Sequence, residues 1–457
     1  MNFLFYDTET TGVNVAFDQI VQFAAIVTDE NFVELDRLNI RCRLLPWIVP
    51  SPVALLVTKT SPENLTNLDL PSHFEMMAEI RDWLGKWKPA TFIGYNSIKF
   101  DEILLHRAFW QTLNPPYVSV TNGNSRFDLL PVIRALSVLK PEIIEIAFND
   151  EGNRTFKLDK LALANGYNAH NAHDALGDVE ATIFLARKIA ERAPEFWETL
   201  TSRTSKSDVS SALAPEEPVY VLDSSPASPR MRWAQRIDRD LRTSDATLAY
   251  LDDDWDQIAG QFEDAKQPPE SSYSKYLRTI SLNKSPVFFT LDEADRLFSA
   301  APQNKHIQRS DLLKKADWLR ELSEFLKKHK ALKSERPPEL EETIYDGFAG
   351  KSDALLMEKF QRSDWPERAE ISKLFSDNRF RRLATRIIYV SSPNLLTEQE
   401  RSRMDIAIQE RLHTPPEVEV PWRSIASARA ELEPAKKQWG EEEGYADIER
   451  WISSLDH

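Results

Sequence analysis

Apolar residues in the first two hundred positions follow two spacings, one typical of strands and the other of helices. Strands are predicted where apolar and β-branched residues form short runs. The first three runs follow one another closely, which predicts a strand meander that opens a mixed sheet. The predicted strands are NFLFYD (2–7), QIVQFAAIV (19–27), LNIRCRLL (38–45) and TFIGY (91–95).

Helices are predicted where apolar residues recur every three or four positions. In residues 73–87, Phe74, Met77, Ile80 and Leu84 have this spacing, and the pattern ends near Gly85 and Pro89. Strands and helices therefore interleave, which predicts an α/β domain. Further helices are expected at residues 100–113, 126–139, 157–166 and 173–192.

The composition changes twice along the chain. Residues 201–218, TSRTSKSDVSSALAPEEP, are rich in Ser and interrupted by Pro, which is typical of a linker. Short apolar runs then predict a small β-rich module with a basic helix behind it. After a second break at residues 334–342, the pattern is mostly helical. We therefore expect three domains, at residues 1–204, 205–338 and 339–457.

Composition supports a folded protein of the cytoplasm. The 457 residues are 42% hydrophobic and 28% charged, as in globular proteins. Cys42 is the single cysteine, so an internal disulfide is excluded. No basic, apolar leader begins the sequence, and no run of about 18 apolar residues is found, so we expect no membrane association.

The net charge of −15 argues against a surface that is coated by nucleic acid. Locally, residues 305–336 hold ten Lys or Arg against five Asp or Glu. This segment is either a positive face or a solvated helix with mixed charges, and the sequence favours neither.

Two acidic residues end the first predicted strand. Asp7 and Glu9 are two positions apart, so their side chains point to the same face. The carboxyl end of a strand in an open α/β sheet is a common place for a ligand. Oxygen-only donors favour Mg²⁺ or Mn²⁺ over zinc. A polar turn closed by Gly12 is an equal alternative for this stretch taken alone.

Two later segments carry further candidate residues. Asp101 opens a helix after a buried strand, where an acid is more often only a cap. Asp178 lies inside the predicted helix of residues 173–192. His173 precedes Asp178 by five positions, so we place His173 on the loop or first turn before the helix, where an imidazole can act as a general base. His170 is interpreted as a surface residue.

The order D-x-E, then N-x-x-x-F-D, then H-x-x-x-x-D resembles the histidine-bearing branch of the DEDD superfamily of 3′→5′ exonucleases. GYNSIKFDEILLHRAFW, NGNSRFDLLPVIRAL, TFKLDKLALANGYNAHNAHDALGDVEATIFLA, SLNKSPVFF and IYDGFAGKSD are similar to stretches of the bacterial exonuclease I family in the same order. The resemblance implies a ribonuclease H-like exonuclease domain, an SH3-like β-barrel and a helical C-terminal domain.

The resemblance also implies the chemistry. Asp7, Glu9, Asp101 and Asp178 would hold two Mg²⁺ ions, with Mn²⁺ as a substitute, and His173 would deprotonate the attacking water. The implied substrate is single-stranded DNA, hydrolysed from its 3′ end to 5′-mononucleotides in DNA repair and recombination. The implied partner is the acidic tail of single-stranded DNA-binding protein, and we expect a monomer.

Further substrate contacts are expected with open alternatives. Thr10, with Thr11, offers backbone amides or simply forms a turn, and Arg126 at a predicted helix start contacts DNA or forms an internal ion pair. Phe100 stacks a base or packs in the core. Lys284 in the NKSP turn contacts a phosphate. Lys157 replaces the arginine of the family and loses its bidentate fork. Glu9 also faces the substrate.

Two rival functions remain at this point. An exoribonuclease would use the same acids and histidine, although about 250 residues that follow the nuclease domain favour DNA. A binding scaffold without catalysis is the other rival, but all four acids and the histidine are present.

Overall fold

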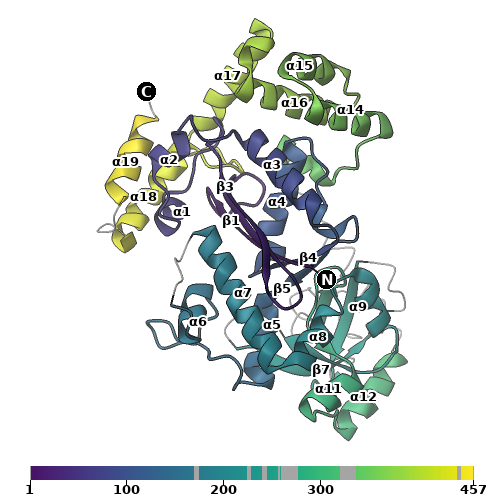
Figure 1. The fold of residues 1–457 in the computed structure, drawn as a ribbon. Coiled ribbons are helices and arrows are strands. Elements are labelled where there is room, and N and C mark those ends of the chain that lie inside the picture. Colours follow the sequence, from purple (N-terminus) through teal and green to yellow (C-terminus); the bar gives the residue numbers. More distant parts are fainter. Residues whose placement is uncertain are drawn as a thin grey trace.

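The computed structural model describes most of the chain in three regions (Figure 1). Two are built around β-sheets, and the third is helical. The described residues are 2–168, 174–223, 228–238, 244–255, 258, 276–316, 318–319, 336–439 and 444–455.

The first sheet has five strands in the order β3-β2-β1-β4-β5. β1 is antiparallel to β2 and parallel to β4, and β2 is antiparallel to β3, so the predicted meander within a mixed sheet is confirmed. The strands are β1 Asn2–Thr10, β2 Ile20–Thr28, β3 Glu34–Arg41, β4 Ala90–Gly94 and β5 Ser125–Asp128.

Helices cover both faces of this sheet because β1 is apolar on both sides. Phe3 and Phe5 pack with α5 and α7, whereas Leu4 and Tyr6 pack with α3 and α4. This burial on both faces is typical of ribonuclease H-like α/β domains. The helices are α3 His73–Lys86, α4 Asp101–Gln111, α5 Leu129–Leu139 and α7 Ala175–Arg192; shorter ones are α1 Pro52–Val57, α2 Pro62–Thr66, α6 Leu158–Ala164, α8 Pro194–Thr201 and α9 Lys206–Leu213.

The sequence prediction for Arg126 was wrong in its secondary structure. Arg126 lies on β5, which pairs in parallel with β4, and not at the start of a helix. The helix α5 begins one residue after Asp128, whose carboxylate caps it by accepting a hydrogen bond from the Leu130 amide at 3.1 Å. The third strand also begins and ends earlier than predicted, because β3 covers Glu34–Arg41 and the prediction was residues 38–45.

A second sheet follows, with the strand order β10-β6-β7-β8-β9 and antiparallel pairing throughout. The predicted β-rich module is therefore confirmed as a sheet, while its description as an SH3-like barrel stays a prediction. The elements are β6 Val219–Asp223, β7 Arg230–Arg236, β8 Asp245–Tyr250, β9 Leu277–Ser281, β10 Phe288–Phe289, α11 Leu291–Phe298 and α12 Asn304–Lys314.

The last region is helical, as predicted, and it returns to the first domain (Figure 1). Its apolar residues share one cluster with Phe74, Trp110 and Leu113, and a second cluster joins α18 and α19 to α1. The domain boundaries themselves stay a prediction. The helices are η4 Leu340–Tyr345, α14 Lys351–Arg362, α15 Trp365–Leu374, α16 Asn378–Ser391, η5 Pro393–Leu395, α17 Glu398–Leu412, α18 Ile425–Trp439 and α19 Tyr445–Ser454.

A buried ion cluster fastens this helical region to α4. The Glu341 carboxylate accepts hydrogen bonds from Arg386 at 3.0 Å and from Arg411 at 2.6 Å. Arg107 on α4 donates to the backbone carbonyl of Glu341 at 2.5 Å. Three elements that are remote in sequence therefore meet at one residue.

Among the described residues, no helix has the length and apolar character that crossing a membrane requires.

Candidate metal centre

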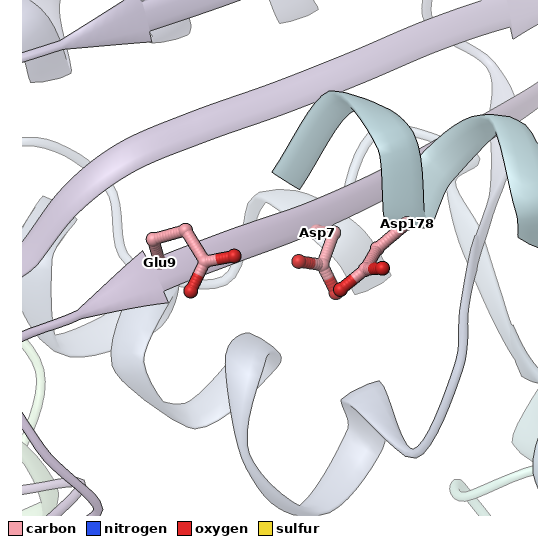
Figure 2. Close-up of side chains that lie close together, drawn as sticks. All are labelled: Asp7, Glu9 and Asp178. Atoms are coloured by element: carbon pink, nitrogen blue, oxygen red, sulfur yellow. The ribbon is translucent and has the colours of Figure 1, made fainter. Parts of the chain in front are cut away.

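Three carboxylates converge at the carboxyl end of β1. Asp7 and Glu9 project from the same face of the strand, and Asp178 approaches from the first turn of α7 (Figure 2). One carboxylate oxygen from each residue lies within 4.8 Å of the other two. Oxygens this close to one another have the spacing of ligands around a single cation.

Asp101 adds a fourth acid to this face. It is the first residue of α4 and is buried, and its Oδ1 accepts a hydrogen bond from the Thr8 hydroxyl at 2.5 Å. Thr8 lies between Asp7 and Glu9 on β1, so this bond ties α4 directly to the strand that carries the other acids. The Asp101 charge acts on both Asp7 and Glu9.

The electrostatics of the cluster disfavour four bare charges. Burial raises the pKa of Asp7 well above its usual range, and the neighbouring carboxylates of Asp101 and Asp178 raise it further. The same two causes raise the pKa of Glu9 to about 8, although Arg41 opposes them. Burial raises the pKa of Asp101 to about 7, against the hydrogen bond from Thr8. A cation is needed to keep these groups ionised together.

The connection from β4 to α4 is held in a defined shape. Asn96 adopts a left-handed conformation with φ of 61°. The Asp128 carboxylate accepts hydrogen bonds from the backbone amides of Asn96 at 2.8 Å and Ile98 at 3.4 Å. A Cβ at Gly94 would lie 2.4 Å from Ser97, so only glycine fits there. This loop sets where α4 begins and therefore where Asp101 lies.

The loop that leaves β1 is fixed by Asp18. Its carboxylate accepts hydrogen bonds from the Thr11 hydroxyl at 2.9 Å and from Arg423 at 3.1 Å. A Cβ at Gly12 would lie 2.5 Å from an Asp18 oxygen, so Gly12 is required for close approach. Ser51 also donates to Glu431 at 2.7 Å. The C-terminal segment thus supports the loop beside the acids.

Asp174 anchors the start of α7. Its Oδ1 accepts hydrogen bonds from Gln22 on β2 at 2.9 Å and from Arg41 on β3 at 3.0 Å. These contacts fix the segment that leads to Asp178. His173, the predicted general base, and His170 lie outside the described residues.

The other sequence-predicted residues divide into two groups. The Thr11 amide donates to the Gln19 carbonyl at 3.0 Å and the Thr10 hydroxyl to the Gly12 carbonyl at 2.8 Å, which are turn contacts. Phe100 is half-buried and packs against the core. Lys157 and Lys284 are exposed and available to a ligand.

Arg126 is the exception among these candidates, because the residue is only 7% exposed and forms an internal ion pair with Glu102. Of the two alternatives that the sequence left open, the structure favours the ion pair.

An exposed aromatic group near α4 was missed by the sequence reasoning. Phe348 is 85% exposed and makes an edge contact with the Tyr117 ring at 6.0 Å between centroids. Tyr345 is 59% exposed beneath the Arg107 guanidinium. Both rings lie in the stretch IYDGFAGKSD, whose apolar residues follow neither a helical nor a strand spacing, so the sequence pattern gave no sign of them.

The donor set fits a hard divalent cation. All the candidate ligands are carboxylate oxygens, and their mutual repulsion is the condition that a bound cation relieves. Zinc in a structural site would favour Cys or His donors, and Cys42 is buried in another part of the domain. Asp7, Glu9, Asp101 and Asp178 therefore form a candidate centre for Mg²⁺ or Mn²⁺.

Comparison with known families agrees with this geometry. The exonuclease family matches residues 4–186, the part that contains all four acids. The family described as the exonuclease I C-terminal domain matches residues 338–453. Together the two matches cover well over half of the chain.

Curated proteins that are similar to this chain are named exodeoxyribonuclease I. Exodeoxyribonuclease I of Haemophilus influenzae is 36% identical over 211 residues, which are 46% of this chain and 44% of that enzyme. Exodeoxyribonuclease I of Escherichia coli is 27% identical over 421 residues, 88% of each chain. This chain thus spans less than half of the first relative and most of the second.

Solved structures share the fold over the full length. Escherichia coli exonuclease I in complex with a dA16 oligonucleotide superimposes with a TM-score of 0.83 at 22% identity, covering 100% of this chain and 99% of that chain. Exonuclease I from Methylocaldum szegediense gives 0.82 at 23% identity, with 99% of both covered. The first domain has the ribonuclease H-like architecture of the exonuclease family that it matches. The chain thus combines a domain of the exonuclease family with an exonuclease I C-terminal domain, and its fold is similar to that of exonuclease I over its full length.

Proposed function

We propose that this protein hydrolyses single-stranded DNA from the 3′ end and releases 5′-mononucleotides, with a role in DNA repair and recombination. The observation that carries the proposal is the convergence of Asp7, Glu9 and Asp178 beside Asp101. Structures of Escherichia coli exonuclease I with oligonucleotides, including a zinc-bound form with single-stranded DNA, support the proposed substrate and the binding of a metal.

The carboxylates would hold two Mg²⁺ ions. Ions bound there supply Lewis acidity for the attacking water and for the departing 3′-oxygen. Thr8 keeps Asp101 oriented through its hydroxyl, and Arg41 and Gln22 hold the start of α7 through Asp174. His173, next to Asp174 in sequence, is the proposed base that accepts the proton from water.

The exposed aromatic group is the proposed contact for the bases of the strand. Aromatic faces bind single strands with little sequence preference, at about 1–3 kcal/mol per stacked base. Phe348→Ala should therefore weaken oligonucleotide affinity by roughly five- to a hundredfold, measured by fluorescence anisotropy. Phe148→Ala, at a comparably exposed phenylalanine in the loop between α5 and α6, is the matched control. Equal effects of the two substitutions would contradict the assignment.

The main test is degradation of end-labelled oligonucleotides in Mg²⁺. The unaltered chain should shorten single-stranded DNA from the 3′ end, leave duplex DNA largely intact and act poorly on matched RNA. Asp178→Ala should abolish the reaction. Faster turnover of RNA would favour the exoribonuclease alternative, and binding of DNA without hydrolysis would favour a scaffold.

The proposed protein partner is the acidic tail of single-stranded DNA-binding protein, bound through the basic segment near Lys314 to Arg336. Part of this segment, including Lys327, Lys328 and Lys330, lies outside the described residues. Replacing these three lysines with Ala should weaken binding of the tail peptide in calorimetry without changing oligonucleotide hydrolysis. Unchanged peptide affinity would remove the assignment.

A further inference from the structure

The turn between β9 and β10 is hydrogen-bonded to Arg126 of the first domain. Arg126 Nε donates to the Asn283 carbonyl at 2.6 Å, and the Ser285 hydroxyl donates to the Arg126 carbonyl. Ser285 is buried and has φ of 42°, in the region that non-glycine residues rarely adopt. The turn therefore has a defined conformation that its contacts with β5 hold in place.

The other end of the Arg126 guanidinium reaches the helix that carries Asp101. Its Nη1 forms an ion pair with Glu102, which is 1% exposed. The second Glu102 oxygen accepts a hydrogen bond from the Ser119 hydroxyl. Glu102 directly follows Asp101 in the first turn of α4. One planar, buried guanidinium thus joins this turn of α4 to the turn of the second sheet.

The turn also carries an exposed cation. Lys284 lies between Asn283 and Ser285, and its amide donates to the Ser281 carbonyl at 3.1 Å. Both chain neighbours of Lys284 are therefore bonded to Arg126, while the lysine itself is free to face solvent. A positive side chain on a rigid turn is suited to a phosphate of a nucleic-acid strand.

We propose that Arg126 is a positioning residue, which keeps Lys284 at a fixed place relative to Asp101 so that the turn and the acidic centre act on the same strand. The proposal rests on the exonuclease function given above and adds to it a coupling between the two sheets. A guanidinium can donate hydrogen bonds to Glu102 and Asn283 at the same time because its donors are spread over a rigid plane. The ammonium group of a lysine cannot reach both.

A purely structural role for Arg126 predicts a different outcome. Loss of an interface contact alone would lower the stability of the protein and affect substrates of every length equally. A positioning role predicts that long substrates, which reach the turn, are affected and that short ones are not.

The test compares two substrates in two variants. Ser285→Ala removes one contact of the turn, and Arg126→Lys keeps a charge beside Glu102 but loses the bond to Asn283. KM for a single-stranded oligonucleotide should rise about five- to tenfold, the effect of one lost hydrogen bond. kcat/KM for the p-nitrophenyl ester of thymidine 5′-monophosphate, which does not reach the turn, should stay unchanged.

Two matched controls separate positioning from stability. Arg203 is also a buried arginine. It forms an ion pair with Glu293 and donates a hydrogen bond to the backbone carbonyl of Phe288 at 3.0 Å. Ser310 is a buried serine whose hydroxyl donates to Gln235 at 2.6 Å. Arg203→Lys and Ser310→Ala should lower the melting temperature comparably to the test variants and leave KM for the oligonucleotide unchanged.

The coupling to Lys284 has its own test. If Arg126 acts through Lys284, Arg126→Lys should add nothing to the oligonucleotide KM once Lys284→Ala is present. Full additivity of the two substitutions would overturn the proposal, as would an oligonucleotide KM that is unchanged or that rises equally in the two controls. A parallel loss on the thymidine ester would overturn it as well.

Failure of the exonuclease proposal can be recognised separately. If the unaltered chain hydrolyses neither substrate, that proposal fails, and the role of Arg126 is tested on oligonucleotide affinity alone. Arg126→Lys and Ser285→Ala should then weaken binding while the two controls do not. Equal affinities would overturn the positioning role.

Discussion

Buried carboxylates lie at two sites of this molecule whose electrostatic surroundings are opposite. Glu341 lies between Arg386 and Arg411, and although burial opposes its charge, the two guanidiniums outweigh burial and lower its pKa to about 2. At the end of β1, burial and neighbouring carboxylates raise the pKa of Glu9 to about 8. The first site holds one acid between two arginines, whereas the second gathers acids from remote segments, and the effect of Arg41 does not balance them.

This difference in electrostatic surroundings indicates which of the two sites requires a bound cation. A buried ion is tolerated when it is paired and hydrogen-bonded. Glu341 meets this condition with side chains, so it has a structural role at the junction of α4, α16 and α17. Asp7 and Glu9 face further acids, so the missing positive charge has to come from solution. Excess negative charge is therefore the stronger sign of a metal centre than the presence of acids.

The largest expected effect concerns the proposed reaction. Asp7→Asn removes a ligand charge and should lower the rate of oligonucleotide hydrolysis on the order of 10³-fold, since metal stabilisation of the transition state is worth several kcal/mol. Single-turnover assays in Mg²⁺ measure this. The control is Asp150→Asn, an exposed acid in the loop between α5 and α6, which should keep full activity. An active Asp7→Asn protein would refute the metal centre.

The second effect is a change in the free energy of unfolding, which should have opposite signs for substitutions at the two sites. Glu341→Gln leaves Arg386 and Arg411 without their partner and should cost about 3–5 kcal/mol of unfolding free energy. Asp7→Asn in EDTA should instead stabilise the protein, because it removes buried repulsion. Urea unfolding of both variants provides the comparison. Equal destabilisation by both would show that the acids at β1 are already paired.

The third effect is the acid dependence of stability. The Glu341 pKa is lowered from 4.5 to about 2, so its stabilising contribution is complete above pH 4.5 and is lost as the pH falls through 2. The shift corresponds to about 3 kcal/mol. Unfolding free energies measured down this range should therefore fall more steeply in the unaltered protein than in Glu341→Gln. Parallel curves would contradict the assigned shift.

The smallest expected effect is stabilisation by metal. A cation that binds only the folded state at a hundred times its dissociation constant should add about 2.7 kcal/mol to the free energy of unfolding. Calorimetric melting with Mg²⁺ and with EDTA measures it, and Asp7→Asn should lose most of the increment. Glu341→Gln, in contrast, should keep the full increment although its melting temperature is lower.

Local patterns predicted much of the fold and part of the centre. Asp7 and Glu9 were placed correctly because a two-residue period puts them on one face whatever the rest of the chain does. The helices α3, α4 and α7 were predicted from their apolar spacing. That Asp101 and Asp178 meet them was inferred from resemblance to a family, since spacing within one segment holds no information about another.

The missed features are tertiary ones. Arg126 precedes a long apolar helical run, so residues 126–128 were interpreted as the start of a helix. They belong to a strand because β4 lies beside them and pairs with them. Glu341 gave no signal, because its partners come from three other elements. The exposed rings of Tyr345 and Phe348 have no period to detect and were recognised only by their exposure.

The anchoring of the loop after β1 has a consequence for how the protein is made. The Asp18 carboxylate accepts a hydrogen bond from Arg423, and the Ser51 hydroxyl donates one to Glu431, so residues separated by 405 and 380 positions in the sequence hold one another. A ribosome releases the first strand long before it reaches those partners. The loop beside the acidic centre therefore acquires its full support only after Arg423 and Glu431 have been synthesised.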